Sequence, residues 1–185
     1  SELKTHKGVS LIDLPGVYSL SPYTMEEVVT RDYLIDEHPD AIIDLVDASN
    51  IERNLYLTTQ LSELGFPVVI ALNMIDVAEK NGDKIDVDAL SSMLGCKVVC
   101  TSALKGSGLS ELCETAVHAA KSDEIPNGIC TFSSDTEAAL KEIESLISDY
   151  AETLHIRWFA IKVFEGGDIS TMPVEYPNTS NITVN

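Results

Sequence analysis

Short apolar runs rich in β-branched residues recur along the chain, and they constrain its fold more than any other feature. They lie at residues 9–14, 41–46, 68–72 and 97–100, and a polar loop and a helical pattern follow each of them. Strands this apolar are covered on both faces, as in a parallel sheet, and a spacing of about 30 residues suits a βα unit. We therefore expect an α/β fold with a mostly parallel sheet flanked by helices.

Capping residues predict where the helices begin. A capping-box pattern at Thr24 and Glu27 opens one helix, and Ser49 with Glu52 predicts a second that ends at Gly65. Further helices are expected from the cap Asp86 to residue 95, over 108–121, from 134 to about 154, and over 156–165. The helix over 108–121 is expected to turn its apolar residues inward, at Leu109, Leu112, Ala116, Val117 and Ala120.

The composition changes after residue 121 and divides the chain into three parts. We expect an α/β domain over residues 1–121, a linker with a partial helical domain over 122–168, and an irregular tail over 169–185. The longest apolar stretch, residues 66–72, is much shorter than a bilayer span, and no signal peptide opens the chain. We expect the chain by itself to be soluble.

Charge and cysteine usage exclude several kinds of function. Lys and Arg number 12 against 30 Asp and Glu, a net charge of -18, which disfavours nucleic-acid binding. The four cysteines form no C-x-x-C pair and no zinc spacing with histidine, so they are expected to be buried or half-buried free thiols in a reducing compartment.

The loop after the first apolar run contains Asp13 and Gly16 in a D-x-x-G pattern. In a parallel sheet such loops lie at the edge where ligands bind. Asp13 could hold Mg²⁺ through water, and the N–H of Gly16 could approach a phosphate closely. A plain Pro-Gly turn is the alternative, since this tetrapeptide is common.

Two further loops carry groups that could recognise guanine. The segment Asn73-Met74-Ile75-Asp76 follows the third run. The Asp76 carboxylate could accept hydrogen bonds from N1–H and N2–H₂ of guanine. The Asn73 side chain could hold neighbouring loops together and reach N7 of the base. After the fourth run, Ser102 and Ala103 begin a turn whose N–H groups could point at guanine O6. An ordinary helix cap and an ordinary strand–helix connection are the alternatives. The order of the three motifs favours a guanine-nucleotide site.

The chain also resembles the ferrous iron transport protein B family. Four stretches carry the resemblance, at residues 13–23, 54–61, 71–76 and 101–106, and it extends from about Gly8 to Gly166. It implies a cytoplasmic GTPase domain that binds GTP or GDP with Mg²⁺, followed by a helical domain and by a transmembrane iron-permease region of the same polypeptide in the bacterial inner membrane. It implies that residues 134–165 begin a helical domain that modulates nucleotide release. The resemblance leaves open whether the chain forms a homo-oligomer.

The resemblance assigns roles to individual residues. Asp13 would be the magnesium-side carboxylate, Gly16 the γ-phosphate donor, Asn73 and Asp76 the guanine readers, and Ser102 and Ala103 the base-contacting turn. Two departures from most small GTPases follow. Met74 replaces a lysine whose stem packs on the base, which implies looser retention, and Val17 stands where a water-orienting glutamine is common.

One motif that the resemblance requires is not found in the sequence. No G-x-x-x-x-G-K-[ST] pattern occurs in the 185 residues, and the resemblance places such a loop, with switch I, upstream of Ser1. We expect the chain as given to bind nucleotide poorly or not at all. Two alternatives stay open: a nucleotide-independent interaction module on the same fold, and another small GTPase such as a ribosome-assembly factor.

Overall fold

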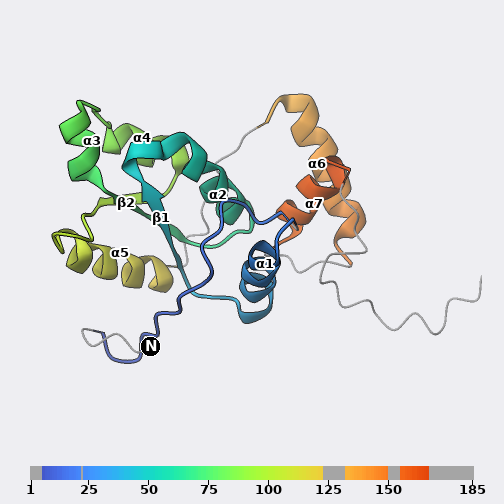
Figure 1. The fold of residues 1–185 in the computed structure, drawn as a ribbon. Helices are drawn as coiled ribbons and strands as arrows, with labels where there is room; N and C mark the ends of the chain where they lie inside the picture. The colour runs from blue at the N-terminus through green and yellow to red at the C-terminus, as the bar shows by residue number, and fades with distance from the viewer. Residues whose placement is uncertain (1–5, 22, 123–131, 150–154, 167–185) are drawn as a thin grey trace, which may run out of the picture.

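The computed structural model describes residues 6–21, 23–122, 132–149 and 155–166. Within them, three parallel strands form a sheet in the order β1 (Ile42–Asp47), β2 (Val68–Asn73) and β3 (Lys97–Cys100) (Figure 1). Parallel strands bring their carboxyl ends to one edge, so the loops after them are neighbours. The expected α/β architecture is confirmed, with a strand count that differs from the sequence prediction.

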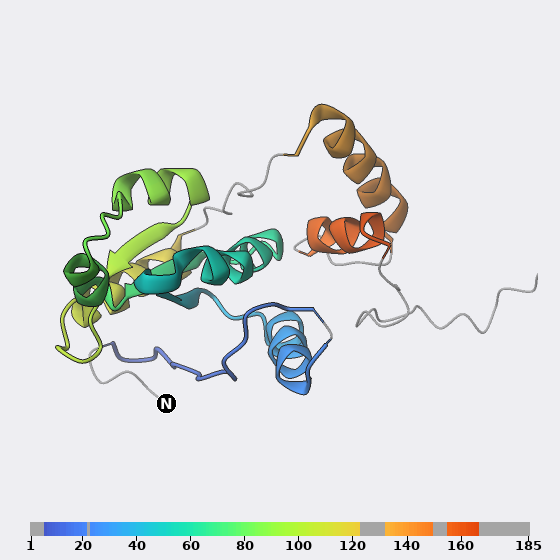
Figure 2. The same cartoon turned by 45° about the horizontal axis from the view of Figure 1, so that its top comes forward.

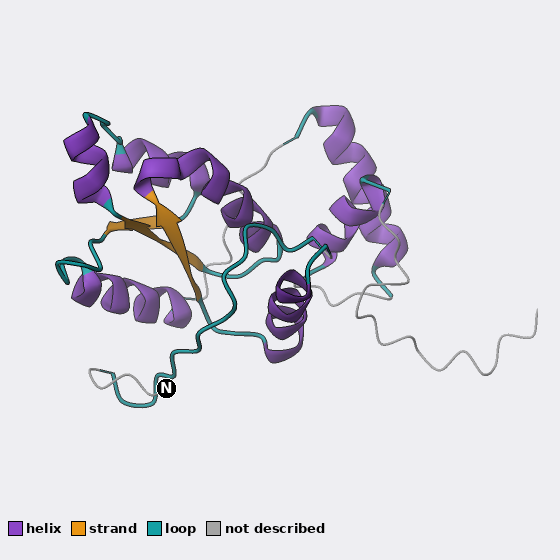
Figure 3. Ribbon diagram, in the orientation of Figure 1, coloured by secondary structure: helices purple, strands orange, loops and turns teal. Residues whose placement is uncertain are grey.

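Helices cover both faces of the sheet because β2 alternates its side chains between two cores. Val68, Ile70 and Leu72 belong to the main core, which also includes residues of α2 (Ile51–Glu63) and α4 (Val87–Leu94). Val69 and Ala71 point the other way and pack with Val99 and with α5 (Leu109–Lys121). Figure 3 shows the helices on either side of the orange strands. This alternation is the period-two pattern of a strand.

The remaining helices extend the main core. α1 (Met25–Glu37) contributes Leu34 and Ile35, and α7 (Ile156–Phe164) contributes Trp158 and Phe159. α7 also packs against α6 (Ser134–Ile147), and both lie at the end of α2 away from α3 (Ile75–Asn81) (Figure 2). Nδ1 of the buried His155 ring lies 2.8 Å from the carbonyl oxygen of Leu64. The helical part is therefore in contact with the α/β part. No helix among the residues described has the length and apolar character to cross a bilayer.

Two of the predicted caps are confirmed and one is wrong. Thr24 accepts from the N–H of Glu27 and donates its own N–H to the Glu27 carboxylate, which is a capping box, and Asp86 accepts from Ala89 N. The N–H and hydroxyl of Ser49 instead donate to Asp47 Oδ1, at 2.8 and 2.7 Å. The Asp47 carboxylate therefore opens a short 3₁₀ helix, η1 (Ala48–Asn50), ahead of α2.

Smaller expectations need correction as well. The helix expected from 134 begins there, as α6, with Ser133 as its cap, but it ends at Ile147 and not near residue 154, and the Ser148 hydroxyl then donates to a backbone carbonyl. Leu109 and Cys100 are exposed. Residues 150–154, most of the predicted linker, Cys130 and the predicted tail at 169–185 lie outside the described residues.

The expected strand over residues 9–14 is wrong. Apart from a single bridge residue at Ser10, this segment is not part of a strand, and Leu11 and Ile12 are 47% and 55% exposed. A strand needs a neighbour that takes up its backbone hydrogen bonds. Among the described residues the sheet contains three strands, and β1 pairs with β2. The apolar pattern alone could not supply a partner.

Candidate functional site

The turn between β2 and α3 holds two of the predicted guanine readers. Asn73 ends β2, Met74 takes a left-handed conformation at φ 61°, and α3 then begins at Ile75 with Asp76 in its first turn. A long side chain seldom adopts this conformation, so the turn is held by its surroundings. The carbonyl oxygen of Met74 accepts from Val77 N at 2.9 Å and from Ala78 N at 3.2 Å, which fixes the start of the helix.

Asn73 ties this turn to the loop after β3. Its Oδ1 accepts from the N–H of Ala103 at 3.0 Å and lies 3.5 Å from the hydroxyl of Thr101. Thr101 N also donates to the Leu72 carbonyl, which continues the pairing of the two strands beyond their ends. The tie expected of Asn73 is present. Asn73 and Ala103, 30 residues apart in sequence, are therefore neighbours at the carboxyl edge of the sheet.

Glycines shape the loop after β3. Ser102 and Ser107 exchange backbone hydrogen bonds of 3.1 and 3.3 Å, so the loop closes on itself. Gly106 and Gly108 both have positive φ, 69° and 78°. A Cβ at Gly108 would overlap the carbonyl oxygen of Cys100, whereas one at Gly106 would meet nothing within 4 Å. Only glycine lets the loop fold back this closely on the end of β3.

A lysine in this loop contacts the predicted base-reading carboxylate. Lys105 Nζ lies 2.9 Å from Asp76 Oδ2, and the side chain of Asp76 is 16% exposed against 56% for that of Lys105. The hydrogen bond from Lys105 lowers the pKa of Asp76 below its ordinary value, and a hydrogen bond from Ser102 acts in the same direction. Sequence reasoning gave Lys105 no role. The signal available was a lysine within the small-residue turn itself.

The structure thus brings together four of the seven residues predicted for the site (Asn73, Asp76, Ser102 and Ala103), with Met74, 42% exposed, in the same turn. Asp13 and Gly16 are not joined to them. Among the described residues no hydrogen bond or ion pair links either one to the β2–α3 turn or to the loop over 101–108. Their segment runs as an extended chain and leads into α1, and α1 lies away from α3 in Figures 1 and 2.

The residues that follow Gly16 contact α2 instead. The ring of Tyr18 lies 4.0 Å from the guanidinium of Arg53, and the buried N–H of Leu20 donates to Gln60 Oε1 at 2.7 Å. Asp13 is exposed, and a Cβ at Gly16 would meet nothing within 4 Å. Because no strand forms over residues 9–14, no strand carries Asp13 to the carboxyl edge.

The described side chains offer few protein ligands to Mg²⁺. In the part of the chain that the structure describes, no group of three or more His, Cys, Asp or Glu side chains could hold a metal ion. Asp13 is a single exposed carboxylate. Mg²⁺ commonly binds through one or two carboxylates while water and phosphate oxygens complete its shell. Asp13 therefore fits a magnesium ion shared with a nucleotide, and it does not fit a metal site made by protein alone.

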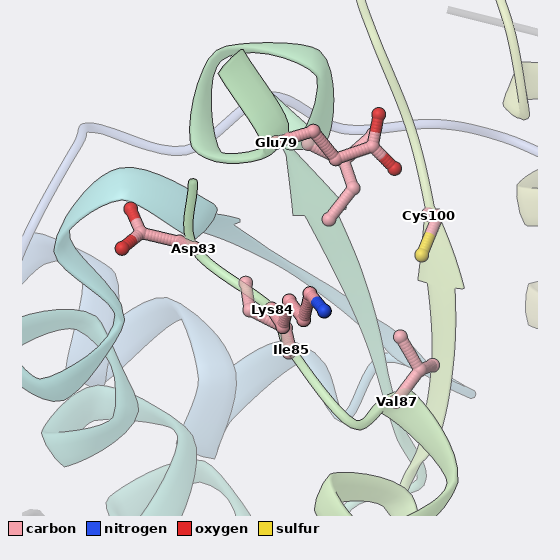
Figure 4. A pocket seen from close by; sticks show the side chains of 7 residues that line it. Glu79, Asp83, Lys84, Ile85, Val87 and Cys100 are labelled. Atoms are coloured by element: carbon pink, nitrogen blue, oxygen red, sulfur yellow. The ribbon is translucent and has the colours of Figure 1, made fainter. Parts of the chain in front are cut away.

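A pocket of about 260 Å³ lies between α3, the segment that leads into α4 and the end of β3, and its lining does not include the predicted guanine readers. Figure 4 shows the side chains that line it, Ile75, Glu79, Asp83, Lys84, Ile85, Val87 and Cys100. Although Cys100 as a residue is exposed, partial desolvation of its thiol, together with the carboxylates of Glu111 and Glu79, raises the pKa of that thiol. A thiol held in its neutral form is a poor nucleophile. The chemistry of the chain therefore concentrates at the paired loops rather than in this pocket.

Two family models match the chain. One described as ferrous iron transport protein B matches residues 1–116, and one described as FeoB cytosolic helical domain matches residues 132–172. The chain is 44% identical over 164 residues to the Fe(2+) transport protein A/Fe(2+) transporter FeoB fusion protein of Porphyromonas gingivalis, covering 85% of the chain and 19% of that protein. It is 38% identical over 169 residues to the Fe(2+) transporter FeoB of Escherichia coli K12, covering 88% and 21%. The chain spans about a fifth of the length of these relatives.

Solved structures agree with the sequence matches. A GDP-bound variant of the S. thermophilus FeoB G-domain superposes with a TM-score of 0.86 at 41% identity, covering 96% of this chain and 68% of that one. A GMPPNP-bound S. thermophilus NFeoB variant gives a TM-score of 0.82 at 43% identity, covering 90% and 65%. These matches exclude the alternative of an unrelated small GTPase. The chain belongs to the ferrous iron transport protein B family.

Proposed function

We propose that this chain is a guanine-nucleotide-binding domain that hydrolyses GTP and thereby regulates ferrous iron transport by a membrane region of the same polypeptide. The domain would then face the cytoplasm at the bacterial inner membrane. Two observations outside the chain support this. Its curated relatives are named as Fe(2+) transporters, and two solved relatives carry GDP or GMPPNP.

Base recognition rests on Asp76. A carboxylate can accept two parallel hydrogen bonds, from N1–H and from N2–H₂ of guanine, and adenine offers neither donor in that arrangement. Ser102 and Ala103 stand on the adjoining loop, where a backbone N–H could reach guanine O6. Asn73 holds the two loops together through its bond to Ala103. The contact of the two loops is the observation that carries the proposal.

Phosphate binding would involve the segment that contains Asp13 and Gly16. Gly16 offers an N–H with open space where a side chain would stand, and Asp13 offers a single carboxylate toward a hydrated cation. Mg²⁺, when bound, neutralises charge on the phosphate oxygens. Val17 has no polar atom with which to orient water, so hydrolysis has to depend on other groups. For this segment to join the base site, it has to move from its present place beside α2.

The test compares nucleotides that differ only in the base. Joined to the upstream G-x-x-x-x-G-K-[ST] loop that the resemblance implies, the chain should bind GDP more tightly than ADP, and Asp76→Asn should abolish that preference, because an amide cannot accept from both guanine donors. The same substitution should favour xanthosine diphosphate, whose C2 carbonyl can accept from the new amide. Competition against a fluorescent GDP analogue measures all three affinities. Asp83→Asn, in the loop after α3, is the matched control and should change none of them.

Unchanged discrimination in Asp76→Asn would refute the assignment of the base-reading loop. Absence of nucleotide binding by this longer chain, even with millimolar ligand, would instead favour the interaction module. Iron enters the proposal through the relatives alone, since the described residues hold no cluster suited to a metal.

A further inference from the structure

Lys105 covers the carboxylate that the proposed function needs. Its ammonium lies 2.9 Å from Asp76 Oδ2, and the Asp76 side chain is only 16% exposed. We propose that Lys105 acts as an internal competitor of guanine, occupying the Asp76 carboxylate until a guanine base displaces it. This inference rests on the proposed function and adds a residue that sets both affinity and base specificity.

Geometry makes the two partners exclusive. Guanine needs both Asp76 oxygens at once, approached in the plane of the carboxylate. The Asp76 side chain is only 16% exposed, and Lys105 takes Oδ2 from the neighbouring loop. Little of the carboxylate is left open to solvent, so a base cannot form its two parallel bonds while the ammonium stays in place.

The competitor is also easy to displace. The Lys105 side chain is 56% exposed and sits in a loop where the next residue, Gly106, has open space around it. An ion pair this exposed contributes little to stability, because water and salt screen it and a long side chain must be held in one geometry. Guanine therefore has to overcome only a small cost, which adenine does not encounter because it makes no bond to Asp76. Lys105 should lower the affinity for guanine nucleotides and leave that for adenine nucleotides unchanged.

Lys105→Met tests the proposal, since it keeps the aliphatic stem and removes the charge. Titrating GDP and ADP into the chain joined to the upstream phosphate loop should show GDP binding tightened by about two- to fivefold, the range expected for loss of an exposed ion pair, with ADP unchanged. Lys105→Arg keeps the pair and should behave as the unsubstituted chain. Lys97→Met removes the same charge from the exposed start of β3, at the opposite edge, and should leave the GDP-to-ADP ratio unchanged.

A second readout needs no nucleotide. Carbon-13 NMR titration of the Asp76 carboxyl should show its pKa rising in Lys105→Met, and an unchanged value would show that the ion pair is absent in solution and overturn the inference. A guanine preference that stays the same or falls in Lys105→Met would overturn it while leaving the proposed function intact. Equal affinities for GDP and ADP in the unsubstituted chain with that loop, or no binding of either nucleotide, would overturn the proposed function and the inference together.

Discussion

Gly108→Ala is the substitution whose effect follows most directly from the structure. Gly108 has φ 78° and stands where the loop after β3 turns into α5. An added Cβ would overlap the Cys100 carbonyl oxygen and crowd the Thr101 Cα, which are backbone atoms and cannot rotate away. The loop would have to shift away from the end of β3, and the hydrogen bond from Ala103 N to Asn73 would be strained with it.

Gly106→Ala separates the two contributions to this cost. Both glycines are left-handed in the same loop, and placing an alanine there costs about 1–2 kcal/mol. A Cβ at Gly106 meets nothing within 4 Å, so that variant should lose this amount and no more. Gly108→Ala has to relieve the overlap as well, which typically adds about 1–3 kcal/mol. We expect a total loss of about 2–5 kcal/mol for Gly108→Ala.

Urea unfolding followed by circular dichroism gives the free energy of unfolding of both variants beside the unsubstituted chain. The midpoint should move much further for Gly108→Ala than for Gly106→Ala, with similar slopes. Equal losses in the two variants would mean that the close approach of this loop to β3 does not exist in solution. The argument that glycine at 108 holds the base-contacting turn in place would then fail.

Two further predictions concern buried polar groups. Burial raises the pKa of Asp44 above its ordinary value, against the opposing hydrogen bond from Thr58, so the folded state binds the proton more tightly. The free energy of unfolding that the protonated form contributes should be lost as pH rises from about 4 through the folded pKa. Urea unfolding at several pH values should therefore show the free energy of unfolding of Asp44→Asn rising relative to that of the unsubstituted chain over this pH range. A difference that stays constant with pH would contradict the prediction. In the same assay Gln60→Ala should lower the free energy of unfolding by about 1–3 kcal/mol, because the buried N–H of Leu20 keeps no acceptor. Thr59→Ala on the same helix is the control and should lower it little. Equal losses in the two variants would refute the role of the hydrogen bond from Leu20 to Gln60.

The features that the sequence determined are those that depend on neighbours along the chain. The caps at Thr24 and Asp86 form because each side chain meets an N–H three residues later. The continuous apolar run of residues 68–72 needs only a helix on each face to be buried, and it became β2. The Asn73 tie was also expected, because parallel strands bring their following loops to one edge.

The tertiary structure decided what depends on residues far apart in the chain. Residues 9–14 have the pattern of a strand, yet a strand exists only where a second one accepts its backbone hydrogen bonds, so composition could not settle their state. The pair between Lys105 and Asp76 and the contact of His155 with Leu64 span 29 and 91 positions, and neither leaves a local signal. Local patterns fix which atoms are available, whereas the packing of the sheet and its loops fixes which of those atoms meet.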